Sequence, residues 1–292
     1  MATVKDFGNS IRPTWCPGCG DYGIWNALKR AFAASGYEPD EIMMVTGIGC
    51  GSKMNDYMHI SGLHTLHGRT LAVATGFKLA NPGMKVVCVH GDGDGYGEGG
   101  NHFLHTVRRN IGLVDIIENN HVYGLTRGQY SPTSRPGFRT RTSPSGAIDA
   151  PMNPVALAIA EGATFVARSF ALDLEQLSGL VVQALEHRGY ALIDVMQPCV
   201  SFNRAMDYDW YRSRVYKVED EGHDPSDRLA AMAKAFEYPG GENRIPTGIL
   251  YRREDVPSYE EQVTAIQREP LVDQPLHVRQ SDDYQALVQA FV

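Results

Sequence analysis

The apolar positions of roughly the first 200 residues follow two patterns, a helical spacing and short unbroken runs. In the segment 21–34, Ile24, Leu28 and Phe32 fall on one face of a helix. The run MKVVCVHG (84–91) is instead short, apolar and rich in β-branched residues, which is typical of a buried strand. Applied along the chain, these patterns predict helices at 21–34, 68–80, 98–110, 153–162 and 173–188, and strands at 41–49, 84–91, 113–119, 164–168 and 190–198.

This alternation of helices and strands predicts an α/β fold with a mostly parallel sheet that has helices on both faces. Residues 84–119 form a β–α–β unit within it. The segment 124–146 is rich in Gly, Ser, Thr and Pro and predicts a long functional loop, because loops beyond about 12–15 residues rarely lack a role. From about residue 205 onward the chain is more polar and irregular. We therefore expect a domain at 1–204 and a C-terminal extension at 205–292 that packs on the domain or on a partner.

Composition and charge narrow the classes of function. The chain has 292 residues and a net charge of -7, and no run of Lys or Arg exceeds two residues. Nucleic acid and anionic membranes are therefore not expected partners, because both need a basic surface. The first residues, MATVKDFGNS, lack the apolar core of a signal peptide, and the odd number of five cysteines argues against a secreted disulfide framework. We expect a cytoplasmic protein.

The segment HGDGDGYGEGGN (90–101) combines glycines that would let the backbone approach a phosphate with two carboxylates, Asp92 and Asp94. One interpretation is an acidic surface turn. A second is a dinucleotide site, since a G-x-G-x-x-G pattern starts at Gly95 and Glu118 ends the next predicted strand. That pattern begins four residues after its strand, however, and it leaves both aspartates unexplained.

A third interpretation explains the aspartates of this segment: a divalent cation lies between a carboxylate and a phosphate and binds both. Asp92 stands at the carboxyl end of one predicted strand, and Asn119 and Asn120 stand at the end of the next. Ligands of open α/β sheets gather at this edge, and Mg²⁺ commonly takes one or two carboxylates together with phosphate oxygens. The sequence therefore favours a magnesium–phosphate site, with 26 residues between Gly93 and Asn120.

Four of the five cysteines lie in predicted loops beside Gly or Pro: the C-x-x-C pair Cys16 and Cys19, then Cys50 and Cys199. Cys88 lies inside a predicted strand and is expected to be a buried apolar residue. A thioredoxin-like redox pair would leave Cys50 and Cys199 idle. Zinc sites usually show two paired knuckles, whereas a [4Fe-4S] cluster accepts scattered ligands. Spacing alone leaves zinc, a cluster and unligated thiols open.

Five motifs, taken in their order along the chain, resemble those of a known protein family. WCPGCGDYGI, GIGCGSK, HTLHGR, GDGDGYGEGGNH and NNHVYGLTRGQYSPTS together resemble the β subunit of 2-oxoacid:ferredoxin oxidoreductases, and the similarity runs from about residue 10 to 218. The GDG followed by about 26 residues and Asn also resembles the thiamine diphosphate motif. The resemblance implies the diphosphate-binding half of the thiamine diphosphate-binding fold. It also favours a cluster over zinc, because zinc has no redox role to offer a reducing thiamine intermediate.

The resemblance assigns cofactor ligands to matching positions of this chain. It implies that Cys16, Cys19, Cys50 and Cys199 hold a [4Fe-4S] cluster, and that Asp92, the Asn120 side chain and the Val122 carbonyl hold Mg²⁺. The remaining residues expected to contact thiamine diphosphate are Gly49, Cys50, His67, Gly91, Gly93, Asp94, Gly124, Leu125 and Thr126.

The implied reaction is oxidative decarboxylation of a 2-oxoacid, with electrons passing through the cluster to ferredoxin and coenzyme A taking the acyl group. The family's α subunit brings the glutamate that activates thiamine, so this chain alone should be inactive, and a dimer of αβ heterodimers is expected. Lys53 and Arg127 follow glycine motifs and could hold a second carboxylate or a coenzyme A phosphate, which favours 2-oxoglutarate over pyruvate or a broad range of 2-oxoacids. The arginines of 135–141 have no assigned role.

Two rival functions stay open at this point. The first is a non-oxidative thiamine decarboxylase or synthase, although such chains usually carry their own glutamate and need no set of four cysteines. The second is a nucleotide-binding regulatory module stabilised by zinc, which would not be an enzyme.

Overall fold

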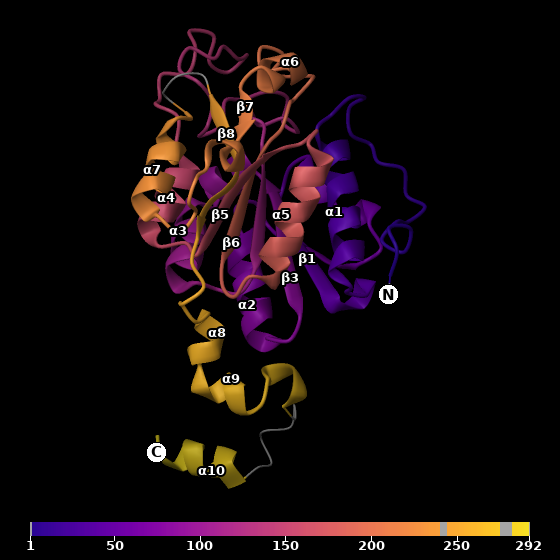
Figure 1. Ribbon diagram of the computed structural model, residues 1–292. Helices are drawn as coiled ribbons and strands as arrows, with labels where there is room; N and C mark the ends of the chain where they lie inside the picture. The colour runs from indigo at the N-terminus through magenta and orange to yellow at the C-terminus, as the bar shows by residue number, and fades with distance from the viewer. Residues whose placement is uncertain (1, 240–243, 275–281, 292) are drawn as a thin grey trace.

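In the computed structural model, residues 2–239, 244–274 and 282–291 are described, and they contain an eight-stranded sheet (Figure 1). The strand order is β2-β1-β3-β4-β6-β5-β8-β7, and neighbouring strands are parallel except for β5 and β8. The mostly parallel sheet predicted from the sequence is confirmed. The strands are β1 (Ile42–Thr46), β2 (Ser61–His64), β3 (Lys85–Gly91), β4 (Val114–Asn119), β5 (Phe165–Phe170), β6 (Ala191–Met196), β7 (Val215–Lys217) and β8 (Ile245–Arg252).

Helices cover both faces of the sheet, as the sequence predicted. Successive side chains of a strand point to opposite faces, and β3 shows this clearly. Val87 and Val89 pack on the face covered by α1 (Asp21–Ser35) and α5 (Leu174–Glu186), whereas Val86 and Cys88 pack on the other. Cys88 is fully buried, as expected. The second face is covered by α2 (Thr70–Ala80), α3 (Gly100–Arg109), α4 (Pro154–Glu161) and α7 (Arg228–Phe236).

The glycine-rich segment that follows β3 is helical, although glycine is a poor helix former. Residues Gly93–Glu98 form a single stretch of π-helix, and the Gly99 N–H donates to the Asp94 carbonyl five residues earlier (2.8 Å). Glycine is required here for packing, because a side chain at Gly93 would collide with the ring of Tyr123. A π-helical turn of this kind is frequent at functional sites.

The chain after residue 205 is less irregular than the sequence predicted. Strand β8 pairs antiparallel with β5, and β7 pairs with β8, so this region extends the main sheet. No helix in the described ranges is long and apolar enough to cross a membrane. The remaining helices are short: α6 (Tyr208–Arg212), α8 (Tyr259–Gln262), α9 (Thr264–Arg268) and α10 (Asp282–Gln289).

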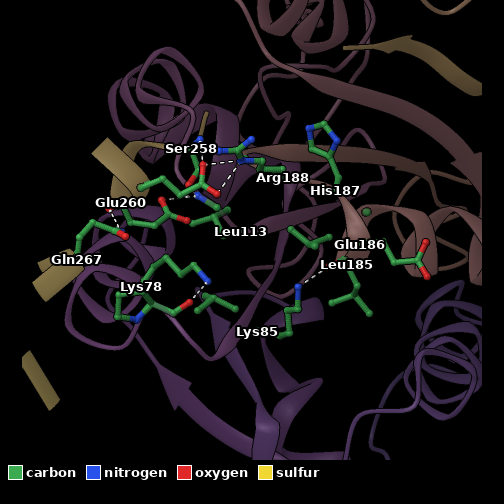
Figure 2. A pocket seen from close by; sticks show the side chains of 17 residues that line it. Lys78, Lys85, Leu113, Leu185, Glu186, His187, Arg188, Ser258, Glu260 and Gln267 are labelled. Carbon is green, nitrogen blue, oxygen red and sulfur yellow. Dashed lines mark hydrogen bonds and ion pairs between the residues drawn. The ribbon is translucent and has the colours of Figure 1, made fainter. Parts of the chain in front are cut away.

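At the amino-terminal edge of the sheet, the C-terminal segment closes a cavity of about 280 Å³ (Figure 2). Lys85 at the start of β3 lines it from the sheet, where its ammonium donates to a backbone carbonyl. Glu260 accepts a hydrogen bond from the Gly112 N–H (3.1 Å), and Glu261 pairs with Arg188 (2.6 Å). These contacts attach the C-terminal segment to the edge opposite the predicted magnesium site.

His187 beside this cavity is expected to make stability depend on pH. Its Nε2 lies 2.8 Å from the Thr164 hydroxyl, and burial, aided by Arg252, lowers its pKa to about 4. The unfolded chain, with an ordinary histidine pKa of about 6.5, therefore binds more protons between these two values. Neutral His187 therefore contributes its full share of the free energy of unfolding above pH 6.5, and this contribution is lost as pH falls towards 4. We expect the loss to be about 1–2 kcal/mol, which allows for the partial exposure of the histidine to solvent.

Urea unfolding at pH 7.5 and pH 5 measures this effect. The wild-type protein should lose more unfolding free energy between the two pH values than His187→Gln, which cannot titrate. Equal losses in the two proteins would contradict the assignment.

Candidate functional site

A pocket at the carboxyl edge of the sheet brings together the residues predicted to contact thiamine diphosphate. It is lined by segments that follow β1, β3 and β4. Ile48, Gly51, Glu118 and Tyr123 also line it and were not predicted. The predicted residues in its wall are Gly49, Cys50, His67, Gly91, Asp92, Gly93, Asp94, Asn120, Val122, Gly124, Leu125 and Thr126.

Asp92 is a buried carboxylate held by two hydroxyl groups. It directly follows β3 and is 1 % exposed. Its Oδ2 accepts hydrogen bonds from Ser131 Oγ (2.6 Å) and Thr133 Oγ1 (2.5 Å) of the long loop. Burial raises the pKa of Asp92 to about 6 although both hydroxyls favour the charged form. A divalent cation in the pocket would supply the positive charge that stabilises this carboxylate.

The other predicted magnesium ligands lie in the same pocket. Asn120 Oδ1 accepts the N–H of Val122 (3.0 Å), while its Nδ2 donates to Gln197 Oε1 (3.3 Å). Asn120 is 8 % exposed and Val122 is 2 % exposed, so both are fixed in the wall. A carboxylate, an amide oxygen and a backbone carbonyl are the hard oxygen donors that Mg²⁺ prefers, so the residues present fit this ion together with a diphosphate.

Asp94 contributes to the wall by joining three segments of chain. Burial alone would raise its pKa, but hydrogen bonds and the charge of His90 bring it well below the usual range. Its two oxygens accept five hydrogen bonds, so Asp94 holds the residues after β1 and before α2 against the glycine segment. The donors are Ile48 N (3.0 Å), Gly68 N (2.9 Å), His67 Nδ1 (2.7 Å), His90 Nδ1 (3.0 Å) and Thr70 Oγ1 (3.1 Å).

The four loop cysteines line one cavity directly beside this pocket. Cys16 and Cys19 come from the segment before α1, Cys50 from the segment after β1, and Cys199 from the segment after β6. In the described part of the chain, no three His, Cys, Asp or Glu side chains lie close enough to hold a single metal ion. A [4Fe-4S] cluster takes one thiolate for each of its four irons, and the four cysteines that line this cavity supply that number.

Gly124 leaves room in the cysteine cavity. A Cβ at this position would lie 3.6 Å from Cys50 Sγ and 3.7 Å from Cys199 Sγ. Burial raises the pKa of Cys50 to about 12, so its thiolate needs positive charge nearby, which iron would supply. Trp15 also lines the cavity, and its indole N–H donates to the Cys50 carbonyl (2.8 Å). Cys50, Asn120 and Gly124 line both the cysteine cavity and the thiamine pocket, so the two sites adjoin.

The dinucleotide interpretation is not supported by the geometry. A Cβ on Gly95 would contact the Ile117 and His90 side chains, so this glycine serves helix packing and does not line the pocket. Glu118, the expected ribose ligand, lines the pocket but is buried against Gly51, with 1 % of its surface exposed. Burial and the neighbouring charge of Asp21 raise the pKa of Glu118 well above its usual range.

Lys53 and Arg127 do not line the thiamine pocket. The ammonium of Lys53 donates to Thr14 Oγ1 (3.2 Å), close to the cysteine pair. Arg127 has a φ of 76° at the tip of a tight turn closed by the Tyr123–Gln129 bridge. It lines an adjoining cavity of about 260 Å³ with Arg141, a member of the arginine group that had no assigned role.

Family models cover most of the chain. The C-terminal thiamine pyrophosphate-binding domain of thiamine pyrophosphate enzymes matches residues 45–195. The C-terminal region of the pyruvate ferredoxin oxidoreductase β subunit matches residues 199–268. The first match contains the whole pocket described above and identifies the domain as one that binds thiamine diphosphate.

Individual relatives agree with the family models. The β subunit of 2-oxoacid:ferredoxin oxidoreductase 1 from Aeropyrum pernix is 43 % identical over 91 % of this chain and 86 % of its own length. The 2-oxoglutarate oxidoreductase subunit KorB from Mycobacterium tuberculosis is 44 % identical over 68 % of this chain and 53 % of its own. A structure of 2-oxoglutarate:ferredoxin oxidoreductase from Magnetococcus marinus, with 2-oxoglutarate, coenzyme A and succinyl-CoA bound, matches with a TM-score of 0.89 and 39 % identity, covering 99 % of this chain and 96 % of that one. The chain therefore belongs to the β subunits of the 2-oxoacid:ferredoxin oxidoreductases, enzymes in which a β subunit works with a partner subunit.

Proposed function

We propose that this chain, together with its α subunit, converts 2-oxoglutarate and coenzyme A to succinyl-CoA and carbon dioxide and delivers the two electrons to ferredoxin. In this proposal Asp92, Asn120 and Val122 hold Mg²⁺ against the diphosphate of thiamine. Cys16, Cys19, Cys50 and Cys199 hold a [4Fe-4S] cluster.

The observation that carries the proposal is the shared wall between the two cavities. Cys50 and Gly124 line both the thiamine pocket and the cysteine cavity. Thiamine diphosphate supplies the carbanion chemistry of 2-oxoacid decarboxylation, which leaves electrons to be removed. An acceptor held by an adjoining set of thiols can take these electrons one at a time, a task that zinc cannot perform.

The residues of this chain would bind and orient the cofactors. The hydroxyls of Ser131 and Thr133 fix Oδ2 of Asp92, so Oδ1 is the oxygen that would bind the cation. Gly91 and Gly93 allow the backbone to approach the diphosphate. The aminopyrimidine end of thiamine requires a glutamate that, in this proposal, the α subunit provides.

The preference for 2-oxoglutarate is supported by the relatives and by charge. The Mycobacterium tuberculosis and Magnetococcus marinus proteins are named for 2-oxoglutarate, and coenzyme A is bound in the latter. Lys53 bonds to Thr14, two residues before Cys16, and Arg127 lines the cavity that meets the thiamine pocket at Thr126. Either cation would recognise a second carboxylate if the substrate extends to it.

Reduction of the cluster by substrate tests the proposed function. The anaerobic αβ complex should show the broad visible absorbance of an oxidised iron–sulfur cluster, which 2-oxoglutarate with coenzyme A should bleach. Added ferredoxin should restore the absorbance as it takes the electrons. A colourless, zinc-loaded complex, or a cluster that substrate never reduces, would contradict the proposal.

Alanine substitutions test the two cations. For Lys53→Ala and Arg127→Ala we expect kcat/KM for 2-oxoglutarate to fall about 10- to 100-fold, the loss of one charge-assisted hydrogen bond, with pyruvate affected less than about threefold. Arg139→Ala, an exposed arginine of the long loop, is the matched control and should be unchanged. Equal losses with both 2-oxoacids would contradict a role in recognising the second carboxylate.

A further inference from the structure

Gln197 is a buried amide side chain that lies between the two cofactor sites. It immediately follows β6, it is 1 % exposed, and its backbone N–H donates to the Asn119 carbonyl (3.0 Å). Its side chain lines the cysteine cavity. Because burial removes the amide from water, both its oxygen and its nitrogen need partners inside the protein.

The amide oxygen of Gln197 orients the proposed magnesium ligand Asn120. Gln197 Oε1 can only accept, and it accepts from Asn120 Nδ2 (3.3 Å). This contact turns the Asn120 NH₂ group towards Gln197 and therefore turns Oδ1 to the opposite side, where it also meets the Val122 N–H (3.0 Å). The Val122 N–H therefore selects the oxygen on one side of the Asn120 amide, and Gln197 Oε1 selects the nitrogen on the other.

The amide nitrogen of Gln197 points to the proposed cluster ligand Cys19. Gln197 Nε2 donates to Cys19 Sγ (3.7 Å) and to Asp21 Oδ1. Its two hydrogens allow both bonds at once. A donor to a cluster sulfur stabilises the more negative, reduced state and so raises the reduction potential of the cluster.

The surrounding residues are arranged to hold this amide in place. A Cβ on Gly20 would lie 2.5 Å from Gln197 Cγ and 3.3 Å from Pro198, so only glycine lets the cysteine loop approach. Asn203, whose N–H donates to the Cys199 carbonyl (3.0 Å), also donates from Nδ2 to the Asn120 carbonyl (3.1 Å). The segment that carries Cys199 therefore holds Asn120 at both its side chain and its backbone.

We propose that Gln197 is a positioning residue shared by both cofactor sites: it turns the Asn120 oxygen towards the magnesium ion and donates a hydrogen bond to the cluster ligand Cys19. This inference rests on the proposed function and adds to it a physical link between thiamine binding and the electron acceptor. The link explains why an amide, with one acceptor and two donor hydrogens, occupies this position.

Two measurements on the αβ complex test the inference. Neither measurement requires the enzyme to turn over. The first is the dissociation constant of Mn²⁺ in the presence of thiamine diphosphate, followed by EPR. The second is the ratio of reduced to oxidised cluster at a fixed applied potential. Gln197→Met loses both the hydrogen bond with Asn120 and the hydrogen bond with Cys19. In this variant we expect Mn²⁺ affinity to fall about 10- to 100-fold and the reduced-to-oxidised ratio of the cluster to fall about 2- to 10-fold.

A second variant separates the effect of the hydrogen bond with Asn120 from the effect of the hydrogen bond with Cys19. Gln197→Glu is made together with Asp21→Asn, because a carboxylate at position 197 would otherwise face the buried Asp21 carboxylate. Measured against Asp21→Asn alone, it keeps an acceptor for Asn120 and loses the donor to Cys19, so Mn²⁺ affinity should change less than about threefold while the reduced-to-oxidised ratio falls as in Gln197→Met. Gln183→Met on α5, whose amide contacts Gly179 and Arg252, is the matched control and should leave both quantities unchanged.

The experiments distinguish a failure of the inference about Gln197 from a failure of the proposed function. If Gln197→Met leaves either Mn²⁺ affinity or the reduced-to-oxidised ratio at the wild-type value, the inference is wrong while the proposed function stands. An Asp21→Asn/Gln197→Glu variant that, relative to Asp21→Asn, loses Mn²⁺ affinity without changing the reduced-to-oxidised ratio also overturns it. If the wild-type complex contains no cluster, the proposed function fails and the inference fails with it.

Discussion

Replacing Asp92 with asparagine is expected to weaken binding of Mg²⁺ and thiamine diphosphate by at least about 100-fold, because the substitution removes a charged ligand and not only its support. The side chain keeps its size, and Ser131 and Thr133 keep a partner, so the fold should be retained. Isothermal titration calorimetry with Mg²⁺ and thiamine diphosphate measures the effect. The iron content of the complex should be nearly unchanged, since Asp92 is not in the wall of the cysteine cavity.

Asp40→Asn is the control for the loss of one negative charge. Asp40 is exposed and lies in the short helical turn before β1, away from the pocket. Its substitution should leave the affinity for thiamine diphosphate at the wild-type value. If Asp92→Asn bound the cofactor as tightly as Asp40→Asn, Asp92 would not be a magnesium ligand.

Gly124→Ala is expected to prevent assembly of the cluster while sparing the magnesium ligands. The added methyl group would lie 3.6 and 3.7 Å from the sulfurs of Cys50 and Cys199 in the wall of the cysteine cavity, where it would compete for room with the iron and sulfide of a cluster. Iron content measured after anaerobic reconstitution should fall from about four atoms per chain to below about one. Mg²⁺ affinity should fall much less than in Asp92→Asn.

Gly76→Ala is the matched control for this substitution. Gly76 lies in α2, and a Cβ there would have no neighbour within 4 Å. Its iron content should equal that of the wild type. A Gly124→Ala protein with full iron content would show that the cysteine cavity does not hold a cubane.

The proximity of Asp92 and Asn120, the proposed magnesium ligands, could be predicted because parallel neighbouring strands place their carboxyl ends together. The apolar runs that became β3 and β4 were recognisable, and the two strands pair with Gly91 opposite Glu118. Asp92 and Asn120 therefore had to lie at one edge once the two strands were neighbours. This part of the site follows from the periodicity of the chain and from the chemistry of the residues.

The cysteine cavity could not be derived from spacing. Cys50 follows β1 and Cys199 follows β6, and two other strands stand between β1 and β6 in the sheet. Their approach depends on how the loops at the carboxyl edge fold over it, which local patterns do not encode. The ordered family motifs, and not the C-x-x-C pair alone, indicated that these thiols belong together.

Other features had weak signals or none. Strand β8 contains Pro246 and Gly248, which usually argue against a strand, but β8 pairs with β5 on one side and only with the short β7 on the other. Ser131 and Thr133 lie in one of the family motifs, yet nothing in the sequence connects them to Asp92, 39 and 41 residues away. Gln197 stood two residues before a predicted cluster ligand, and only the fold brings it to Asn120.

The measurement that tests the account most directly is the magnetic interaction between the two cofactor sites. In the αβ complex, Mn²⁺ would replace Mg²⁺ beside thiamine diphosphate, and the EPR signal of the dithionite-reduced cluster would be compared with that of the Mg²⁺ form. Because the two cavities share Cys50, Asn120 and Gly124, we predict marked broadening and faster relaxation of the cluster signal with Mn²⁺. Identical cluster signals with both metals, or a reduced protein without an iron–sulfur signal, would contradict the account.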